Sequence, residues 1–363
     1  MPKLNVGIDV RVAEQIGGIG RYARELVLAL GRRGEHALHA LVYADQDTSW
    51  LPEGIVLIPV SRTAKRMLPL LWEHALLPRS AAVRRLDLMH FPNPTAPLGM
   101  HIPFVATVHD TAIFDHPEWF PSGQSFSTRT VVPRTMRRAR RLLAVTETVK
   151  HNVMNRFGVP DEKISVIPNG VNTEVFSLER ATVEQTLKKF HLDPGYILWV
   201  GRPAPYKNLA FVNTLVQSSE KRFVFVGMDA HEARSAMPAY DETRCTCIAS
   251  IEPGSRELAD LYRGAGVVIQ PSLYESFALP VLEALACGTP AIVSDMPTLR
   301  EIYGNMLEYA PLADLSVWQK KIDRSITNET GRQERSAWAQ KYAWQKIAES
   351  VSAQYAAVLG ERK

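Results

Sequence analysis

The chain has 363 residues, of which 46% are hydrophobic and 22% are charged, and its formal net charge is +4 at pH 7. This length exceeds one ordinary core and favours two domains of a soluble globular protein. No stretch approaches the roughly 20 apolar residues of a membrane span, and three cysteines (Cys245, Cys247 and Cys287) are too few for a disulfide framework. The N-terminal residues have no signal-peptide pattern, so we expect a cytoplasmic protein with reduced thiols.

Short apolar runs alternate with helical patterns through the first half of the chain. Such alternation predicts an α/β domain with a doubly wound parallel sheet, whose ligands lie at the carboxyl ends of the strands. The expected strands are 4–10, 39–44, 54–60, 88–91, 104–107, 142–145 and 164–167.

A glycine turn, Gly17-Gly18-Ile19-Gly20, connects the first expected strand to a helix. Glycine lets main-chain N–H groups approach an anion without interference from a Cβ atom. The turn is an incomplete dinucleotide fingerprint, and a tight turn without a ligand explains it equally well. His109 lies just beyond the carboxyl end of the strand 104–107. Its position is compatible with a ligand contact and with a purely structural role.

Two segments are basic and amphipathic, and we expect helices at 62–85 and 129–143. An anionic membrane surface and ordinary solvation each explain these charges. We expect no nucleic-acid partner.

The second half begins with an expected strand at 196–200, followed by a loop that carries Arg202 and Lys207. Further strands are expected at 223–226, 266–270 and 291–294, with a helix at 257–262. Arginine and lysine near a helix start are typical phosphate ligands.

One βαβ unit within 266–295 organises this half. The helix begins near Pro280 and ends before Gly288, where a glycine cap is expected. Its N-terminus presents free N–H groups and a positive dipole end, which attract phosphate. Glu275 precedes the helix and Glu283 lies one turn inside it. An anion site between two acids indicates a nucleotide sugar.

Glu275 and Glu283 form an E-x7-E pattern inside PSLYESFALPVLEALACGTPAIVSD. This stretch resembles the retaining family 4 glycosyltransferases, and weaker resemblances run from residue 7 to residue 347. The resemblance implies the GT-B fold, in which two Rossmann-like domains face a central cleft. We expect domains at 1–172, joined by a C-terminal helix at 345–363, and at 173–344. The segments Val108-His109-Asp110 and His116-Pro117-Glu118-Trp119 resemble those of mannosyltransferases of the family.

The resemblance also implies roles for individual residues. Glu275 and His109 would contact the transferred sugar, with Asp110 ordering the loop, and Glu283 would bind the ribose hydroxyls. Lys207 and Arg202 are expected to join Glu275 and His109 as catalytic residues by holding the diphosphate. The remaining expected donor-binding residues are Gly17, Gly18, Ser276, Phe277, Ala278 and Leu279. The chain departs from the family at Tyr206, where many relatives carry arginine, and at Ala278, where relatives commonly have glycine. In this chain the arginine of the loop, Arg202, instead directly follows Gly201.

The expected activity is retaining transfer of a hexose, mannose from GDP-mannose, to a lipid-linked or oligosaccharide acceptor in the synthesis of bacterial cell-surface polysaccharide or glycolipid. We expect no cofactor and no metal, because the two cations Arg202 and Lys207 can replace a metal ion beside the diphosphate. A UDP-sugar donor, an epimerase and a non-catalytic nucleotide-sugar-binding subunit remain open. This chain is too short to be a phosphorylase. A dehydrogenase function would leave the E-x7-E stretch unexplained. Peripheral attachment to the inner face of the cytoplasmic membrane is open as well.

Overall fold

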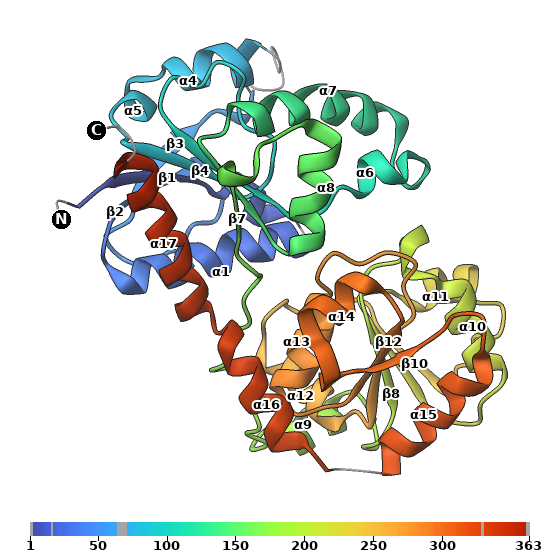
Figure 1. The fold of residues 1–363 in the computed structure, drawn as a ribbon. Coiled ribbons are helices and arrows are strands. Elements are labelled where there is room, and N and C mark those ends of the chain that lie inside the picture. Colours follow the sequence, from blue (N-terminus) through green and yellow to red (C-terminus); the bar gives the residue numbers. More distant parts are fainter. Residues whose placement is uncertain (1–2, 16, 64–70, 328–329, 361–363) are drawn as a thin grey trace. The chain divides into compact units, whose positions relative to one another are not determined.

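A computed structural model describes residues 3–15, 17–63, 71–327 and 330–360. The chain forms two compact units, Met1–Gly170 with Trp344–Lys363, and Val171–Ala343. The boundaries expected from the sequence lie within two residues of these divisions. Figure 1 shows a sheet with flanking helices in each unit.

The sheet of the first unit has seven strands within the described residues, in the order β3-β2-β1-β4-β5-β6-β7. All neighbouring strands are parallel. Every residue of the interior strand β5 is buried, which is typical of a parallel strand covered on both faces. The strands are β1 (Asn5–Asp9), β2 (Ala37–Tyr43), β3 (Val56–Val60), β4 (Leu88–Phe91), β5 (Phe104–Val108), β6 (Arg141–Ala144) and β7 (Ile164–Val166).

The helices of this unit follow the expected alternation. Thr146 caps α8, because its side chain accepts a hydrogen bond from the N–H of Val149. The C-terminal helix α17 packs against α1 (Figure 1), where Tyr22 and Leu26 share a core with Ile347 and Tyr355. The helical segments are η1 (Val10–Glu14), α1 (Gly18–Arg33), η2 (Trp72–Leu76), α4 (Leu77–Arg79), α5 (Ala81–Arg84), α6 (Ala112–Asp115), η3 (Pro117–Trp119), α7 (Ser122–Arg138), α8 (Glu147–Phe157), η4 (Asp161–Lys163) and α17 (Trp344–Gly360).

The second unit has a six-stranded sheet in the part of the chain that is described, in the order β10-β9-β8-β11-β12-β13. Its strands are also all parallel. They are β8 (Ile197–Val200), β9 (Phe223–Val226), β10 (Cys245–Ile248), β11 (Val267–Gln270), β12 (Ala291–Ser294) and β13 (Glu308–Ala310). The helical segments are α9 (Val183–Lys189), η5 (Pro205–Lys207), α10 (Leu209–Gln217), α11 (Ala230–Ala236), α12 (Arg256–Gly264), α13 (Leu279–Ala286), α14 (Pro297–Tyr303), η6 (Gly304–Met306), α15 (Leu315–Thr327), α16 (Arg332–Ala339) and η7 (Gln340–Tyr342).

The predicted fold class, two doubly wound parallel sheets, is confirmed. Within the described ranges, no helix combines the length and the apolar character that crossing a bilayer requires.

The prediction of a basic helix at 129–143 is wrong at its C-terminal end. Helix α7 ends at Arg138, and the backbone of Ala139 is extended. Arg141 begins strand β6, whose next three residues are buried in the sheet. Burial in the sheet therefore outweighs the helical spacing of the apolar residues.

The prediction of one helix at 62–85 is also wrong for its described part, since residues 64–70 lie outside the described residues. Beyond them the helical path is divided at Ser80, whose backbone is extended (ψ 144°). The Ser80 side chain accepts from the N–H of Val83 and starts a new turn there. Arg62 forms ion pairs with Glu14 and Asp45.

Candidate functional site

The loops that follow β8 and β11 meet where the strand order of the second sheet reverses. β8 comes first in this sheet, with β9 and β10 on one side and β11 to β13 on the other. Parallel sheets bind ligands at the carboxyl ends of strands at such a reversal. Lys207 lies in the loop after β8 and Glu275 in the loop after β11. Lys207 Nζ is 2.6 Å from Glu275 Oε1, and their side chains are 12% and 9% exposed.

Both chain neighbours of Lys207 fasten these two loops together. The carbonyl oxygen of Tyr206 accepts a hydrogen bond from the N–H of Leu273 (2.7 Å). The Asn208 side-chain amide donates to the carbonyl of Pro271 (3.1 Å), and Asn208 has a left-handed backbone (φ 54°). The main chain of Lys207 is therefore held against the loop that carries Glu275.

Three donors converge on one oxygen of Glu275. Besides Lys207 Nζ, Gln270 Nε2 lies 2.7 Å and Ser272 Oγ lies 2.8 Å from Glu275 Oε1. The other carboxylate oxygen, Oε2, has no protein partner among the described residues. Glu275 thus offers one free acceptor, which suits a ligand hydroxyl.

The N-terminus of α13 follows directly. The main-chain N–H groups of residues 276–279 donate to no protein group in the described ranges, while the carbonyls of Phe277 and Ala278 are held by Tyr303. Tyr303 Oη lies 2.7 Å from the first carbonyl oxygen and 3.1 Å from the second. Unpaired N–H groups at a helix start form an anion site. The unpaired N–H groups therefore follow Glu275 directly in the chain, next to the Lys207–Glu275 pair. They belong to Ser276, Phe277, Ala278 and Leu279.

Ala278 has a left-handed backbone, with φ 61° and ψ 66°. This conformation favours glycine, so an alanine here is strained. The Ala278 methyl group is nevertheless buried, and the bonds from Tyr303 hold the turn in place.

Glu283 is buried inside α13, with 2% of its surface exposed. Tyr262 Oη donates to its Oε2 at 2.8 Å. A ribose would therefore have to reach a nearly covered carboxylate. Arg202 is exposed and forms no polar contact with the other described site residues, so the structure places Lys207 but not Arg202 against Glu275.

In the first unit, Gly17 precedes α1 with φ 147°, a conformation that favours glycine, and Gly18 is the first residue of the helix. A Cβ atom at Gly17 would have no neighbour within 4 Å, so the turn is open there. Gly20 is different, because its Cβ would lie 2.1 Å from the carbonyl oxygen of Gln15.

His109 directly follows β5 and is 9% exposed. Burial lowers its pKa to about 4, partly opposed by a hydrogen bond to the carbonyl of Pro92. At neutral pH the ring is therefore uncharged. A carbonyl oxygen only accepts, so Nε2 carries the proton and donates to Pro92 at 2.9 Å, leaving Nδ1 as an acceptor. Tyr22 packs edge-on against the ring, with centroids 4.7 Å apart. Asp110 accepts from the N–H of Ala112 (2.9 Å), which orders the following turn.

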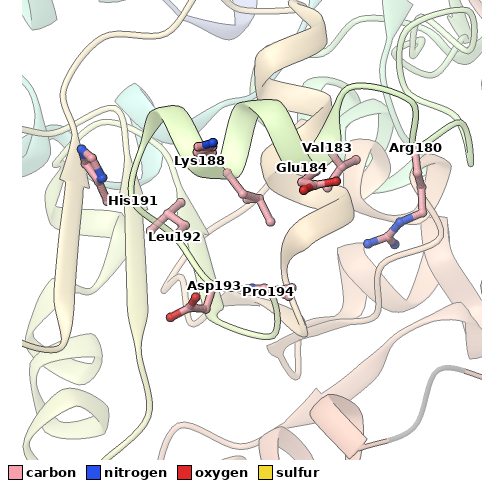
Figure 2. Close-up of a pocket in the computed structure, with 9 residues that line it drawn as sticks. Arg180, Val183, Glu184, Lys188, His191, Leu192, Asp193 and Pro194 are labelled. Atoms are coloured by element: carbon pink, nitrogen blue, oxygen red, sulfur yellow. The ribbon is translucent and has the colours of Figure 1, made fainter.

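A separate pocket of about 610 Å³ lies at the other end of the second sheet, along α9 and the loop that leads into β8 (Figure 2). Charged side chains of both signs, among them Arg180, Glu184 and Asp193, are spread along it in Figure 2. These charges do not gather around one point, and the pocket lies along the segment before β8, whereas Lys207 and Glu275 lie in the loops after β8 and β11.

Sequence reasoning missed Gln270, Ser272, Tyr262 and Tyr303, all of which hold site residues in place. A glutamine at the end of an otherwise apolar strand is a signal that could have found the first of these. The three cysteines are free thiols, as expected. Burial raises the pKa of Cys287 to about 12.

Comparisons with known proteins agree with this geometry. The family described as "Glycosyltransferase Family 4" matches residues 16–175, and "Glycosyl transferases group 1" matches residues 184–341. The chain belongs to the family 4 glycosyltransferases. The match confirms the resemblance inferred from the E-x7-E stretch.

Two curated relatives of this family 4 chain are mannosyltransferases. The O-antigen chain mannosyltransferase RfbU of Salmonella typhimurium is 32% identical over 220 residues, which cover 60% of this chain and 59% of RfbU. The O-antigen chain mannosyltransferase B of Escherichia coli is 26% identical over 364 residues, covering 90% and 93%. This chain is therefore mannosyltransferase-like in sequence.

Solved structures share the fold at low identity. Sucrose-phosphate synthase from Thermosynechococcus elongatus has a TM-score of 0.77 at 20% identity, covering 99% of this chain and all (100%) of the other. HepE of Anabaena, in complex with UDP and glucose, has a TM-score of 0.76 at 15% identity and covers 98% and 100%. WaaG, a glycosyltransferase involved in lipopolysaccharide biosynthesis, has a TM-score of 0.70 at 14% identity and covers 95% and 98%.

Proposed function

We propose that this family 4 chain is a retaining hexosyltransferase that moves mannose from GDP-mannose to a lipid-linked or oligosaccharide acceptor of bacterial cell-surface polysaccharide. The observation that carries the proposal is the Lys207–Glu275 pair beside the unpaired N–H groups of residues 276–279. It combines a cation and an anion-binding helix start with a carboxylate that has one free oxygen. The two O-antigen mannosyltransferase relatives favour mannose as the transferred sugar.

In this proposal the diphosphate of the donor binds at Lys207 and the start of α13, with Arg202 closing over it. As the glycosidic bond breaks, negative charge grows on the leaving phosphate. Donors aimed at that charge stabilise the transition state, each by roughly 3 kcal/mol in comparable oxyanion sites. Gly17 and Gly18 provide the open turn of the first unit for the donor diphosphate and the acceptor.

The sugar hydroxyls are bound by Glu275 through Oε2 and by His109 through Nδ1. A neutral histidine that is already donating to Pro92 can accept from a hydroxyl but has no spare proton to give. Glu283, held by Tyr262, would accept from the ribose. That role requires α13 or the Tyr262 side chain to yield, because Glu283 is 2% exposed.

The acceptor attacks on the face that the phosphate leaves, and the phosphate takes the acceptor's proton. We propose that no covalent enzyme intermediate is involved, because enzymes that use one place two carboxylates beside the glycosidic bond, and Glu275 has no clear second carboxylate partner for that role among the described residues. Lys207 and the helix dipole supply the positive charge, so we propose that no metal ion is needed.

The test is thermal melting with GDP, UDP and ADP sugars, followed by transfer of labelled sugar to membrane extracts. A ligand that binds the folded state alone raises the melting temperature. We expect GDP-mannose to stabilise the chain and Glu275→Ala to abolish transfer while GDP still binds. Stabilisation by UDP sugars instead would show that the donor is a UDP sugar and not GDP-mannose. Binding without transfer to any acceptor would favour a non-catalytic subunit, and interconversion of the sugar would favour an epimerase.

We further propose that the chain, which would act in the cytoplasm, attaches peripherally to anionic lipid through the basic surface of α7. The arginines at positions 129, 134, 137 and 138 are exposed on this helix. In the other basic segment, Leu71 and Leu76 are 52% and 50% exposed. Basic residues favour anionic headgroups by about 1 kcal/mol each. Co-sedimentation with phosphatidylglycerol vesicles should weaken for Arg129→Gln with Arg134→Gln. Arg256→Gln, on the exposed face of α12, is the matched control.

A further inference from the structure

Gln270 and Ser272 form a closed triangle of hydrogen bonds with Glu275. Gln270 Nε2 lies 2.9 Å from Ser272 Oγ and 2.7 Å from Glu275 Oε1. Ser272 Oγ lies 2.8 Å from the same carboxylate oxygen. The donors balance, because the amide has two protons and the hydroxyl accepts one bond and donates another.

Both residues are fully covered by protein, with 0% of their surface exposed. The Gln270 Oε1 atom is buried and has no hydrogen-bond partner in the described chain. Burying an amide with its oxygen unpaired disfavours folding, and an apolar residue at the end of β11 would carry no such penalty. Gln270 therefore has a role other than stabilising the fold. The hydrogen bond from its side-chain nitrogen indicates that this role concerns Glu275.

We infer that Gln270 and Ser272 are positioning residues, which fix Glu275 so that Oε1 is filled and Oε2 is presented to the transferred sugar. This inference rests on the proposed function of Glu275. It assigns the orienting role to the two neutral donors and not to Lys207.

The reason lies in the charges. A diphosphate attracts the Lys207 ammonium, so the lysine can exchange its carboxylate partner for a phosphate oxygen. An amide and a hydroxyl carry no net charge and have little reason to leave Glu275. They also come from the end of a buried strand and the residue two positions beyond it, which are rigid supports.

The experiment compares the wild type with Gln270→Met, Ser272→Ala and Ser272→Thr. Met keeps the approximate volume of Gln without its amide, and Thr keeps the hydroxyl of Ser. The matched control is Ser294→Ala, because Ser294 is a buried serine at the end of the neighbouring strand β12 whose hydroxyl has no partner among the described residues. The measurements are kcat and KM for GDP-mannose, the Kd values of GDP-mannose and of GDP, and the melting temperature. If the melting screen shows that the chain binds UDP sugars, the same measurements use the UDP sugar and UDP.

We expect kcat to fall roughly tenfold to a hundredfold for Gln270→Met and Ser272→Ala, the loss typical of one hydrogen bond to a charged group. The affinity for GDP should stay within about threefold of wild type, so the advantage of GDP-mannose over GDP shrinks. Ser272→Thr should restore most of kcat, and Ser294→Ala should change nothing.

Unchanged kcat in both truncated variants would overturn the inference. So would a parallel loss of GDP affinity and melting temperature, which would mean that the triangle merely supports the loop. A wild-type chain that binds GDP-mannose without transferring it refutes the proposed reaction instead. In that case the inference is still tested by binding. The ratio of the Kd of GDP to the Kd of GDP-mannose should be smaller in Gln270→Met and Ser272→Ala than in the wild type if the two residues orient Glu275.

Discussion

The ion pair between Lys207 and Glu275 should be worth far more than an ordinary surface pair. Their side chains are 12% and 9% exposed, so solvent screens them little. Breaking a fully buried pair costs 3–5 kcal/mol, but Glu275 keeps its bonds from Gln270 and Ser272 when Lys207 is removed. We therefore expect Lys207→Met to destabilise the second unit by about 2 kcal/mol, a fall in melting temperature of roughly 4–8 °C.

A double-mutant cycle with Lys207→Met and Glu275→Gln measures the pair itself. Urea unfolding of the two single variants and the double variant should give a coupling of about 1–2 kcal/mol that persists in high salt. The control is the Lys189–Glu257 pair of the same unit, whose side chains are 57% and 42% exposed. Its coupling should not exceed about 0.5 kcal/mol and should vanish in salt. If the losses of Lys207→Met and Glu275→Gln simply add, the account of the site is wrong.

Three further predictions concern the histidines, the strained alanine and the metal. Burial lowers the pKa of His90 to about 3 and that of His109 to about 4, so the unfolded chain binds more protons below about pH 6.5. The free energy of unfolding should therefore decrease as the pH is lowered, by roughly 2 kcal/mol per histidine at pH 5. A melting temperature that is unchanged between pH 7.5 and pH 5 would contradict this. Ala278→Val should weaken GDP binding and lower the melting temperature, because a β-branched residue is poorly tolerated at φ 61°, whereas Ala278→Gly should preserve both; equal behaviour of the two variants would refute the strain argument. Transfer activity should survive EDTA, and its loss on chelation with recovery on one divalent ion would show that a metal is required.

The architecture was predictable because its signals are local and strong. Strands β4, β9 and β12 have the bounds expected from the sequence, since each is a short apolar run between polar turns. Strands β10 and β13 were not predicted. Both lie at the sheet edges and are only partly buried, so their sequences, CTCI and EYA, lack a continuous apolar pattern.

The basic segments show where local patterns fail. The apolar spacing across 129–143 is helical, yet Arg141 to Ala144 pair in the sheet with β5 and β7. A strand was also expected at 142–145, so the helical and strand patterns overlapped at residues 142 and 143. The strand forms there because it pairs with β5 and β7, and these contacts are long-range. The exact end of a helix next to a strand therefore cannot be read from spacing.

Which site residues touch each other depends on tertiary contacts. The sequence indicated Lys207 and Glu275 separately, 68 positions apart, and their ion pair follows from β8 and β11 being adjacent. The triangle of Gln270, Ser272 and Glu275 was equally hidden, because a pattern of residue types does not show which side-chain atoms meet. The left-handed backbone of Ala278 could not be foreseen from an alanine, whose preference is helical.

The most direct test is a crystal structure of the chain with GDP-mannose bound. We predict phosphate oxygens within hydrogen-bond distance of Lys207 Nζ and the main-chain N–H groups of residues 276–279, with a mannose hydroxyl donating to Glu275 Oε2. A nucleotide sugar bound elsewhere, or none bound at saturating concentration, would contradict this account.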